Sequence, residues 1–231
     1  ENVGGLKFVE VEVPVDYGFW MGLALDDIDH DGDLDIFSTN IGNTIPASSA
    51  RGDLRSDQVL AADWILLRNE GEFNFVDATK ELGLSGYEFA WGAWFEDFNL
   101  DGFSDLLVLE NYIKWPAHKL SKAPGRFFVQ NFEGKFIAAT EQSGLVNENF
   151  GMSPLVSDFN QDGYPDLIMV NIEGPVRAFI NKAGLGHHYI KVKFREIAEN
   201  YGAQVSLVRG DGVTITKQLI SGMGLLSDSG G

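Results

Sequence analysis

The chain contains no cysteine and only four histidines among its 231 residues. It therefore forms no disulfide bond, and zinc and other soft metals lack their preferred sulfur ligands. No stretch approaches the roughly 20 consecutive apolar residues that a membrane-spanning helix requires, so we expect no membrane span. The asparagine-x-serine/threonine signal for N-glycosylation is also absent. Together with the missing cysteines, this absence favours a bacterial source.

Basic residues are scarce as well. The chain has 17 lysines and arginines against 34 aspartates and glutamates, which gives a net charge of −17. Such a charge repels the phosphate backbone, and we exclude DNA and RNA as partners. The sequence also lacks a Gly-x-Ser-x-Gly nucleophile elbow, a His-Glu-x-x-His metal helix and a phosphate-binding glycine loop. The hydrophobic content of 44% nevertheless predicts a globular core.

Three copies of one nine-residue motif stand out among the residues that are present. The motif reads Asp-x-Asp/Asn-x-Asp-Gly-x-x-Asp and begins at Asp27, Asp97 and Asp158. Carboxylates at this density repel one another unless a cation lies among them. Oxygen ligands, with glycine at the sixth position where the chain turns sharply, are typical of a calcium-binding loop. The alternative is an acidic turn whose aspartates only cap neighbouring backbone groups.

Each loop is predicted to hold one Ca²⁺, about three ions in all. Mg²⁺ fits less well, because it requires a small octahedron and keeps its waters. The first loop has a fourth carboxylate, Asp29, where the others have asparagine, and we expect it to bind most tightly. The seventh residue of each loop would contribute its backbone carbonyl. The predicted ligands are Asp27, Asp29, Asp31, Asp33 and Asp35; Asp97, Asn99, Asp101, Phe103 and Asp105; and Asp158, Asn160, Asp162, Tyr164 and Asp166.

The segments around the loops are typical of β-strands. A strand-like run precedes each loop, with a small residue at its start (Gly22, Gly92 and Ser153), and a short aliphatic run follows it. An EF-hand would place glutamate at the twelfth position, which none of the three copies does, so the loops are predicted to join two strands. The runs after the loops end at Asn40, Asn111 and Asn171, and the next runs end at Asn69, Asn131 and Asn181.

An aromatic strand then follows over residues 73–79 and 135–140. Four strands per repeat are typical of a β-propeller blade. We therefore predict an all-β chain with about three blades, in which tryptophans 20, 91 and 94 fill the core between blades. Two insertions, residues 42–63 and 111–126, have the composition of loops. The first contains Arg51-Gly52-Asp53, the tripeptide that integrins bind. Either loop could contact a partner or be an ordinary solvated loop.

The motif and the strands around it resemble the FG-GAP or VCBS repeats of integrin-type β-propellers. Beyond residue 187, the runs 201–207 and 218–227 resemble the opening of an ASPIC/UnbV module. A propeller followed by this module is the arrangement of cartilage-acidic-protein-like secreted proteins. The resemblance implies blades over residues 1–186 and a small β module over 187–231. It also implies a calcium-binding, extracellular, non-enzymatic protein.

The repeats are too few to close a ring, because propellers need roughly four to eight blades. Residues 6–11 look like the last strand of a blade whose other strands are missing, and the module ends before the strands that would complete it. We therefore expect a fragment of a longer polypeptide. The remaining chain or neighbouring subunits would complete the propeller and cover its sheet edges.

Three functions fit this sequence. The first is an extracellular scaffold that Ca²⁺ stabilises, and the second is an adhesion module whose two long loops bind an extracellular protein or glycan. The third is a Ca²⁺-dependent lyase or hydrolase acting on polysaccharides. We favour the non-enzymatic functions, because the carboxylates that can be placed are the predicted metal ligands. The predicted location is secreted or at the cell surface, with the bacterial periplasm or outer surface as alternatives.

Overall fold

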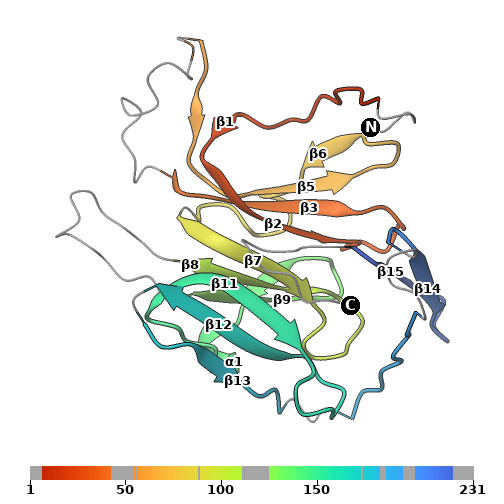
Figure 1. Ribbon diagram of the computed structural model, residues 1–231. Coiled ribbons are helices and arrows are strands. Elements are labelled where there is room, and N and C mark those ends of the chain that lie inside the picture. Colours follow the sequence, from red (N-terminus) through yellow and green to blue (C-terminus); the bar gives the residue numbers. More distant parts are fainter. Residues whose placement is uncertain are drawn as a thin grey trace.

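The computed structural model describes residues 7–42, 55, 57–87, 89–110, 125–172, 174–182, 186–194 and 201–220. Within these ranges the chain is all-β apart from one four-residue helix, and most strands belong to three consecutive antiparallel sheets (Figure 1). The elements are β1 (Tyr17–Gly18), β2 (Trp20–Asp26), β3 (Asp35–Asn40), β4 (Leu60–Ala61), β5 (Ile65–Asn69), β6 (Phe75–Asp77), β7 (Ala90–Glu96), β8 (Asp105–Glu110), β9 (Arg126–Gln130), β10 (Phe136–Ala138), α1 (Thr140–Ser143), β11 (Phe150–Ser157), β12 (Asp166–Ile172), β13 (Arg177–Phe179), β14 (Gln204–Val208) and β15 (Thr214–Gln218).

The three sheets repeat one meander. The first sheet has the order β2-β3-β5-β6, the second β7-β8-β9-β10, and the third β11-β12-β13. All neighbouring strands in these sheets are antiparallel, and each acidic motif forms the hairpin loop between the first two strands. Strands β14 and β15 form a separate hairpin. The prediction that the loops join strands, and not helices, is therefore confirmed.

The second sheet is covered on both faces by its neighbours. Along β8, Leu106 and Val108 belong to the core shared with the first sheet, which also contains Phe37. The alternate residues Leu107 and Leu109 belong to the core shared with the third sheet. Because successive side chains of a strand point to opposite faces, a strand buried on both faces is apolar throughout. This explains why β8 is a continuous apolar run.

A small residue near the start of the first strand of each sheet (β2, β7 and β11) allows neighbouring sheets to approach closely. A Cβ atom at Gly22 would collide with the carbonyl oxygen of Trp91, and one at Gly92 would collide with that of Met152. Both glycines are thus explained by the backbone of the next sheet. Ser153 holds the same position in the third sheet, where the described residues contain no further sheet of this kind.

The finer predictions have mixed outcomes. The described residues form no closed barrel or propeller, and the third sheet has three strands instead of four. Trp94 is buried in the core, as predicted, but Trp20 and Trp91 are partly exposed, and Trp64, which the pattern did not identify, is buried instead. The tripeptide 51–53 and residues 111–124 lie outside the described residues. No helix in the described part of the chain is long and apolar enough to cross a membrane.

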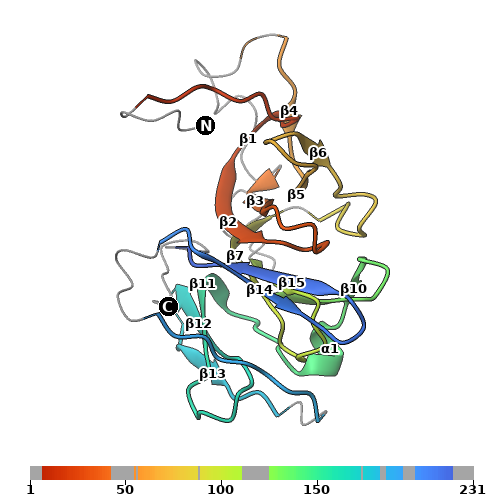
Figure 2. The ribbon, with the colours of Figure 1, turned by 90° about the vertical axis from the view of Figure 1, so that its right-hand side faces the viewer.

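The C-terminal segment that was predicted to form a small β module is described only in part. The predicted run 201–207 overlaps all but the last residue of β14, whereas β15 ends at Gln218, where the second predicted run begins. Residues 221–231 lie outside the described ranges. Figure 2 shows the β14–β15 hairpin lying across the end of the sheets, where the acidic loops turn.

Candidate metal centre

The three acidic loops have the same backbone conformation. The fourth residue of each, His30, Leu100 and Gln161, has a positive φ between 58° and 67°. The glycine at the sixth position has φ between 93° and 97° in all three copies. A glycine adopts this left-handed region without a steric penalty, whereas other residues are uncommon there. The repeated motif therefore encodes a repeated loop geometry.

The first aspartate of each loop caps the loop's own turn. In the first loop one oxygen of Asp27 accepts a hydrogen bond from the Asp31 amide at 3.0 Å, and the other from the Gly32 amide at 3.1 Å. Asp97 and Asp158 accept the equivalent pairs. The fifth residue, Asp31 in the first loop, accepts from the amide two residues further on. These contacts curl the backbone around the carboxylates.

The last aspartate of each loop ties the loop to its sheet. Asp35 is fully buried and accepts hydrogen bonds from the amides of Ile28, at 2.9 Å, and Asn69, at 2.8 Å. Asp105 and Asp166 make the corresponding contacts with their own loops and with the ends of β9 and β13. Each thus fixes the loop against the third strand of the same sheet.

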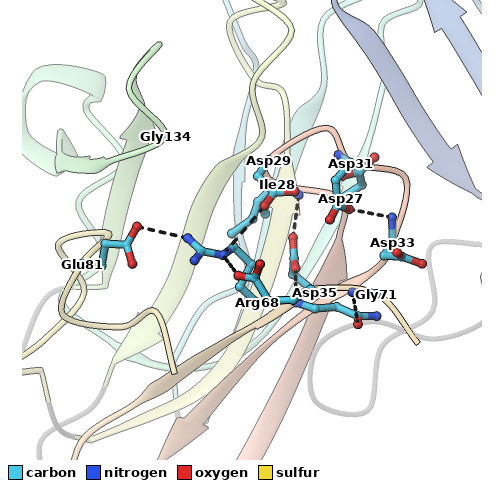
Figure 3. Close-up of polar contacts among 12 residues, drawn as sticks. Asp27, Ile28, Asp29, Asp31, Asp33, Asp35, Arg68, Gly71, Glu81 and Gly134 are labelled. Atoms are coloured by element: carbon cyan, nitrogen blue, oxygen red, sulfur yellow. Dashed lines mark hydrogen bonds and ion pairs between the residues drawn. The ribbon is translucent and has the colours of Figure 1, made fainter. Parts of the chain in front are cut away.

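The first loop gathers a trio of carboxylates. Ligand atoms of Asp27, Asp29 and Asp35 lie within 4.8 Å of one another (Figure 3). Asp27 and Asp35 are buried and Asp29 is exposed. In the second and third loops asparagine replaces Asp29, and Asn99 and Asn160 donate to the fifth residue of their own loops. The other two predicted ligands of the first loop, Asp31 and Asp33, are exposed and do not belong to this close trio.

Burial makes these carboxylates difficult to ionise. It raises the pKa of Asp27 to about 6 and that of Asp35 to about 7, against the hydrogen bonds from backbone amides, which lower both. Burial and, to a smaller extent, the charges of Asp101 and Asp97 raise the pKa of Asp105 to about 8, against the hydrogen bonds from backbone amides. A cation among these oxygens would oppose both effects, because it compensates the negative charge that burial destabilises.

An arginine that the sequence analysis missed lies beside the trio. The Nε atom of Arg68, in β5, is 3.9 Å from a carboxylate oxygen of Asp29, and Figure 3 shows the guanidinium group between Asp29 and Glu81. Arg68 also pairs with Glu70 at 2.7 Å and Glu81 at 3.1 Å. The positive charge of Arg68 partly compensates the negative charge of Asp29, the carboxylate that the other two loops lack.

Side-chain amides connect the first two loops to the sheets that follow them. Gln130, at the end of β9, donates to the Ile28 carbonyl of the first loop at 2.9 Å. Asn181, which follows β13, donates to the equivalent carbonyl of the second loop, that of Phe98, at 2.7 Å. The structure therefore equates Gln130 with Asn69 and Asn181. The sequence pattern predicted Asn131 at this position, because the other repeats have asparagine there; glutamine carries the same side-chain amide and takes its place in the second sheet.

The C-terminal hairpin also contacts the loops. Lys217 of β15 pairs with Asp26, the residue before the first loop, and donates to Ser104 of the second loop at 3.0 Å. Arg209 donates to the Asp101 carbonyl at 2.8 Å. Gln204 donates to the Gly32 carbonyl at 3.1 Å. These contacts hold the hairpin against the first two loops, and no motif in the sequence indicated them.

The donor set is what a hard divalent cation requires. The candidate ligand atoms are carboxylate, amide or carbonyl oxygens, and a carboxylate that accepts backbone hydrogen bonds keeps further lone pairs for a cation. The residues therefore fit such an ion. The comparisons with known proteins give no further guide: no protein-family model matches the chain, and no curated protein sequence shows significant similarity to it.

Proposed function

We propose that the protein is a Ca²⁺-stabilised, non-enzymatic extracellular scaffold whose three sheets are blades of a β-propeller. The observation that carries this proposal is the trio Asp27, Asp29 and Asp35, held within 4.8 Å in a loop whose geometry recurs twice. Three like charges so close together need a compensating cation. The successive packing of the sheets, with Gly22 and Gly92 at equivalent contacts, supports the blade arrangement.

In this scaffold the cations stabilise the end of each sheet. Each loop joins the first two strands, and its last aspartate contacts the third strand, as Asp35 does through Asn69. An ion bound to such a loop therefore links three strands at once. The sheets would then present their long connecting segments to an extracellular protein or glycan. Sites of the weak extracellular class, with dissociation constants of about 10⁻⁴–10⁻³ M, are suited to this environment.

The proposal is tested by thermal unfolding in calcium and in excess chelator. A ligand that binds only the folded state at a hundredfold excess over its dissociation constant stabilises it by about 2.7 kcal/mol per site. We expect chelation to lower the melting temperature strongly, and calcium to restore it better than magnesium does. An unchanged melting curve in chelator would refute the proposal.

Variants then assign the sites. Calorimetric titration of Asp31→Ala, Asp101→Ala and Asp162→Ala should each remove one calcium-binding event, with the largest loss of affinity in the first loop. Glu133→Gln is the matched control, since Glu133 is an exposed carboxylate outside the loops. Full calcium binding by all three alanine variants would show that the loops are only acidic turns.

A further inference from the structure

The outer edge of the third sheet differs from those of the other two. Its outermost strand, β13, pairs with β12, and no strand among the described residues pairs with its other side. A cavity of about 800 Å³ lies along this edge. Apolar side chains from the second sheet, from the turn after α1, from β13 and from the residue that follows β13 line it, including Phe127, Val129, Leu145, Phe179 and Ile180.

The second sheet shows what fills the equivalent position. There β10 is the fourth strand, and Phe136 at its start is only 3% exposed and packs in the core. The Phe136 amide donates to the Leu82 carbonyl at 2.9 Å, and Phe136 lies opposite Gln130 of β9. The turn that contains Leu82 thus receives the fourth strand of the following sheet.

The same turn recurs before the third sheet. Leu82 and Leu84 follow Thr79 by three and five residues, as Ser143 and Leu145 follow Thr140. Leu84 is buried beside Phe136 in the first core, whereas Leu145 and Ser143 line the cavity. The cavity therefore lies where the repeat places the aromatic residue of a fourth strand.

One further segment of the chain has the sequence of such a strand. Lys7-Phe8-Val9-Glu10 matches Asn74-Phe75-Val76-Asp77, which contains β6, and Lys135-Phe136-Ile137-Ala138, which contains β10. The segment lies outside the named strands, although Phe8 takes part in an isolated bridge. Its apolar side chains are exposed, by 73% for Phe8 and 52% for Val9. Exposed apolar strand segments are candidates for pairing with another chain.

The segment cannot reach the open edge of its own molecule in this conformation. It runs beside the first sheet, whereas β13 lies at the opposite end of the molecule in both Figure 1 and Figure 2. A second copy of the chain presents the same segment without this distance constraint.

We propose that the open edge of β13 and its cavity bind the Lys7–Val11 segment of a second copy of this chain. The segment adds as a fourth, antiparallel strand, with main-chain hydrogen bonds to β13 and one anchoring side chain in the cavity. By the register of β10, Phe8 lies opposite Asn181, Val9 opposite Ile180 and Glu10 opposite Phe179. The ring of Phe8 fills the cavity, and its amide donates to the Ser143 carbonyl.

The experiment is sedimentation analysis of the whole chain in calcium-containing buffer. We expect self-association that depends on protein concentration. Phe8→Ala removes the anchor, and Ile180→Asp places a charge at the edge. Each should weaken association at least tenfold, the equivalent of 1.4 kcal/mol. A mixture of the two variants should associate again, because one retains the acceptor edge and the other the donor strand. Phe132→Ala, a change at a side chain that is 83% exposed and outside the cavity, is the control.

A peptide of residues 5–13 provides the second measurement. A fluorescent version should bind the Phe8→Ala chain, whose edge is intact, and should bind the Ile180→Asp chain at least tenfold more weakly. A peptide carrying the Phe8→Ala change should bind neither. Equal binding of both peptides, or a monomer at every concentration without peptide binding, would overturn the proposal. The calcium proposal is judged separately by unfolding, so failure of one leaves the other intact.

Discussion

At the residue scale, two opposing effects act on the charge of the last aspartate of each loop. Asp35, Asp105 and Asp166 are almost completely buried, and each accepts hydrogen bonds from the loop and from the third strand. Those hydrogen bonds stabilise the ionised form, while burial destabilises it. The balance raises the pKa of Asp105 to about 8. With a pKa this high, the carboxyl group is largely protonated at neutral pH. A bound cation would stabilise its ionised form.

Two of the repeated glycines are required by the packing of one sheet on the next. Gly92 faces the Met152 carbonyl of the third sheet, so Gly92→Ala forces backbone atoms apart. Overpacking of this kind typically costs about 1–3 kcal/mol, and we expect a loss of at least 2 kcal/mol here because the obstacle is backbone. Urea unfolding measures it. Gly210→Ala, where a Cβ atom would meet nothing within 4 Å, is the control. A Gly92→Ala variant as stable as the control would contradict this packing.

A buried glutamate makes stability depend on pH. The Glu110 side chain is 4% exposed and pairs with Arg126 at 2.7 Å. Burial raises its pKa to about 7, although the hydrogen bond and charge of Arg126 lower it. The group therefore contributes stability below its unfolded pKa of about 4.5, and this contribution is lost as the pH rises through 7. A shift of this size corresponds to roughly 3 kcal/mol.

Urea unfolding of the wild type and of Glu110→Gln at pH 5 and pH 8 isolates this effect, with calcium held constant. The wild type should lose stability relative to the variant between the two values, because glutamine stays neutral. The carboxylates of the acidic loops titrate in both proteins, so their effect on stability cancels in the comparison. A difference between wild type and variant that does not change with pH would exclude an elevated pKa for Glu110.

At the scale of elements, one lysine holds the C-terminal hairpin against the sheets. Partial desolvation lowers the pKa of Lys217, whose side chain is 46% exposed, but the charges of Asp26 and Glu96 raise it more, so the side chain remains cationic. Lys217→Met would leave the carboxylate of Asp26, which is 8% exposed, without its ion-pair partner. We expect amide exchange in β14 and β15 to accelerate by about 5- to 30-fold, the equivalent of 1–2 kcal/mol.

Hydrogen-exchange mass spectrometry measures this change peptide by peptide. Lys191→Met, at an exposed lysine, is the control with the same change of charge. Strands β2 and β3 should keep their protection in both variants, because Lys217 contacts the first sheet only at its end. Equal protection of the hairpin in the two variants would show that the remaining contacts, such as that of Arg209, are sufficient.

Features set by residues close together in the sequence could be predicted, whereas contacts between distant segments could not. The strands, the loops between them and the glycines are set by local patterns of aliphatic residues and turn residues, and the sequence predicts them. Three strand ends differ from the predicted asparagines by one or two residues: β9 ends at Gln130, β12 at Ile172 and β13 at Phe179, where the pattern predicted Asn131, Asn171 and Asn181. Asparagine marks a turn, but the hydrogen-bonded pairing of the strands decides where each one ends. The contacts of Lys217 and Arg68 join segments distant in the sequence, and no periodic pattern encodes such pairs.

At the scale of the whole molecule, the second sheet connects two apolar cores. Leu66 lies in the core between the first and second sheets, and Leu167 in the core between the second and third. Because β8 contributes alternate side chains to both cores, loss of either core exposes one face of the same strand. The first two loops are also linked to the sheets that follow them, by Gln130 and Asn181. These connections favour unfolding of the three sheets as one unit.

Two large-to-small substitutions, one in each core, test this cooperativity. Leu66→Ala and Leu167→Ala each remove a side chain that is at most 2% exposed, which costs about 2–5 kcal/mol in a packed core. If the sheets unfold together, both variants lower one common urea midpoint, and each accelerates exchange in β3 and β12 alike. Ile137→Ala, at a side chain that is 54% exposed, should leave the midpoint nearly unchanged. Exchange that accelerates in β12 but not in β3 for Leu167→Ala would mean that the third sheet unfolds alone. Its three strands and open edge would then make it the weakest of the three, and strand addition at β13 would selectively restore its protection.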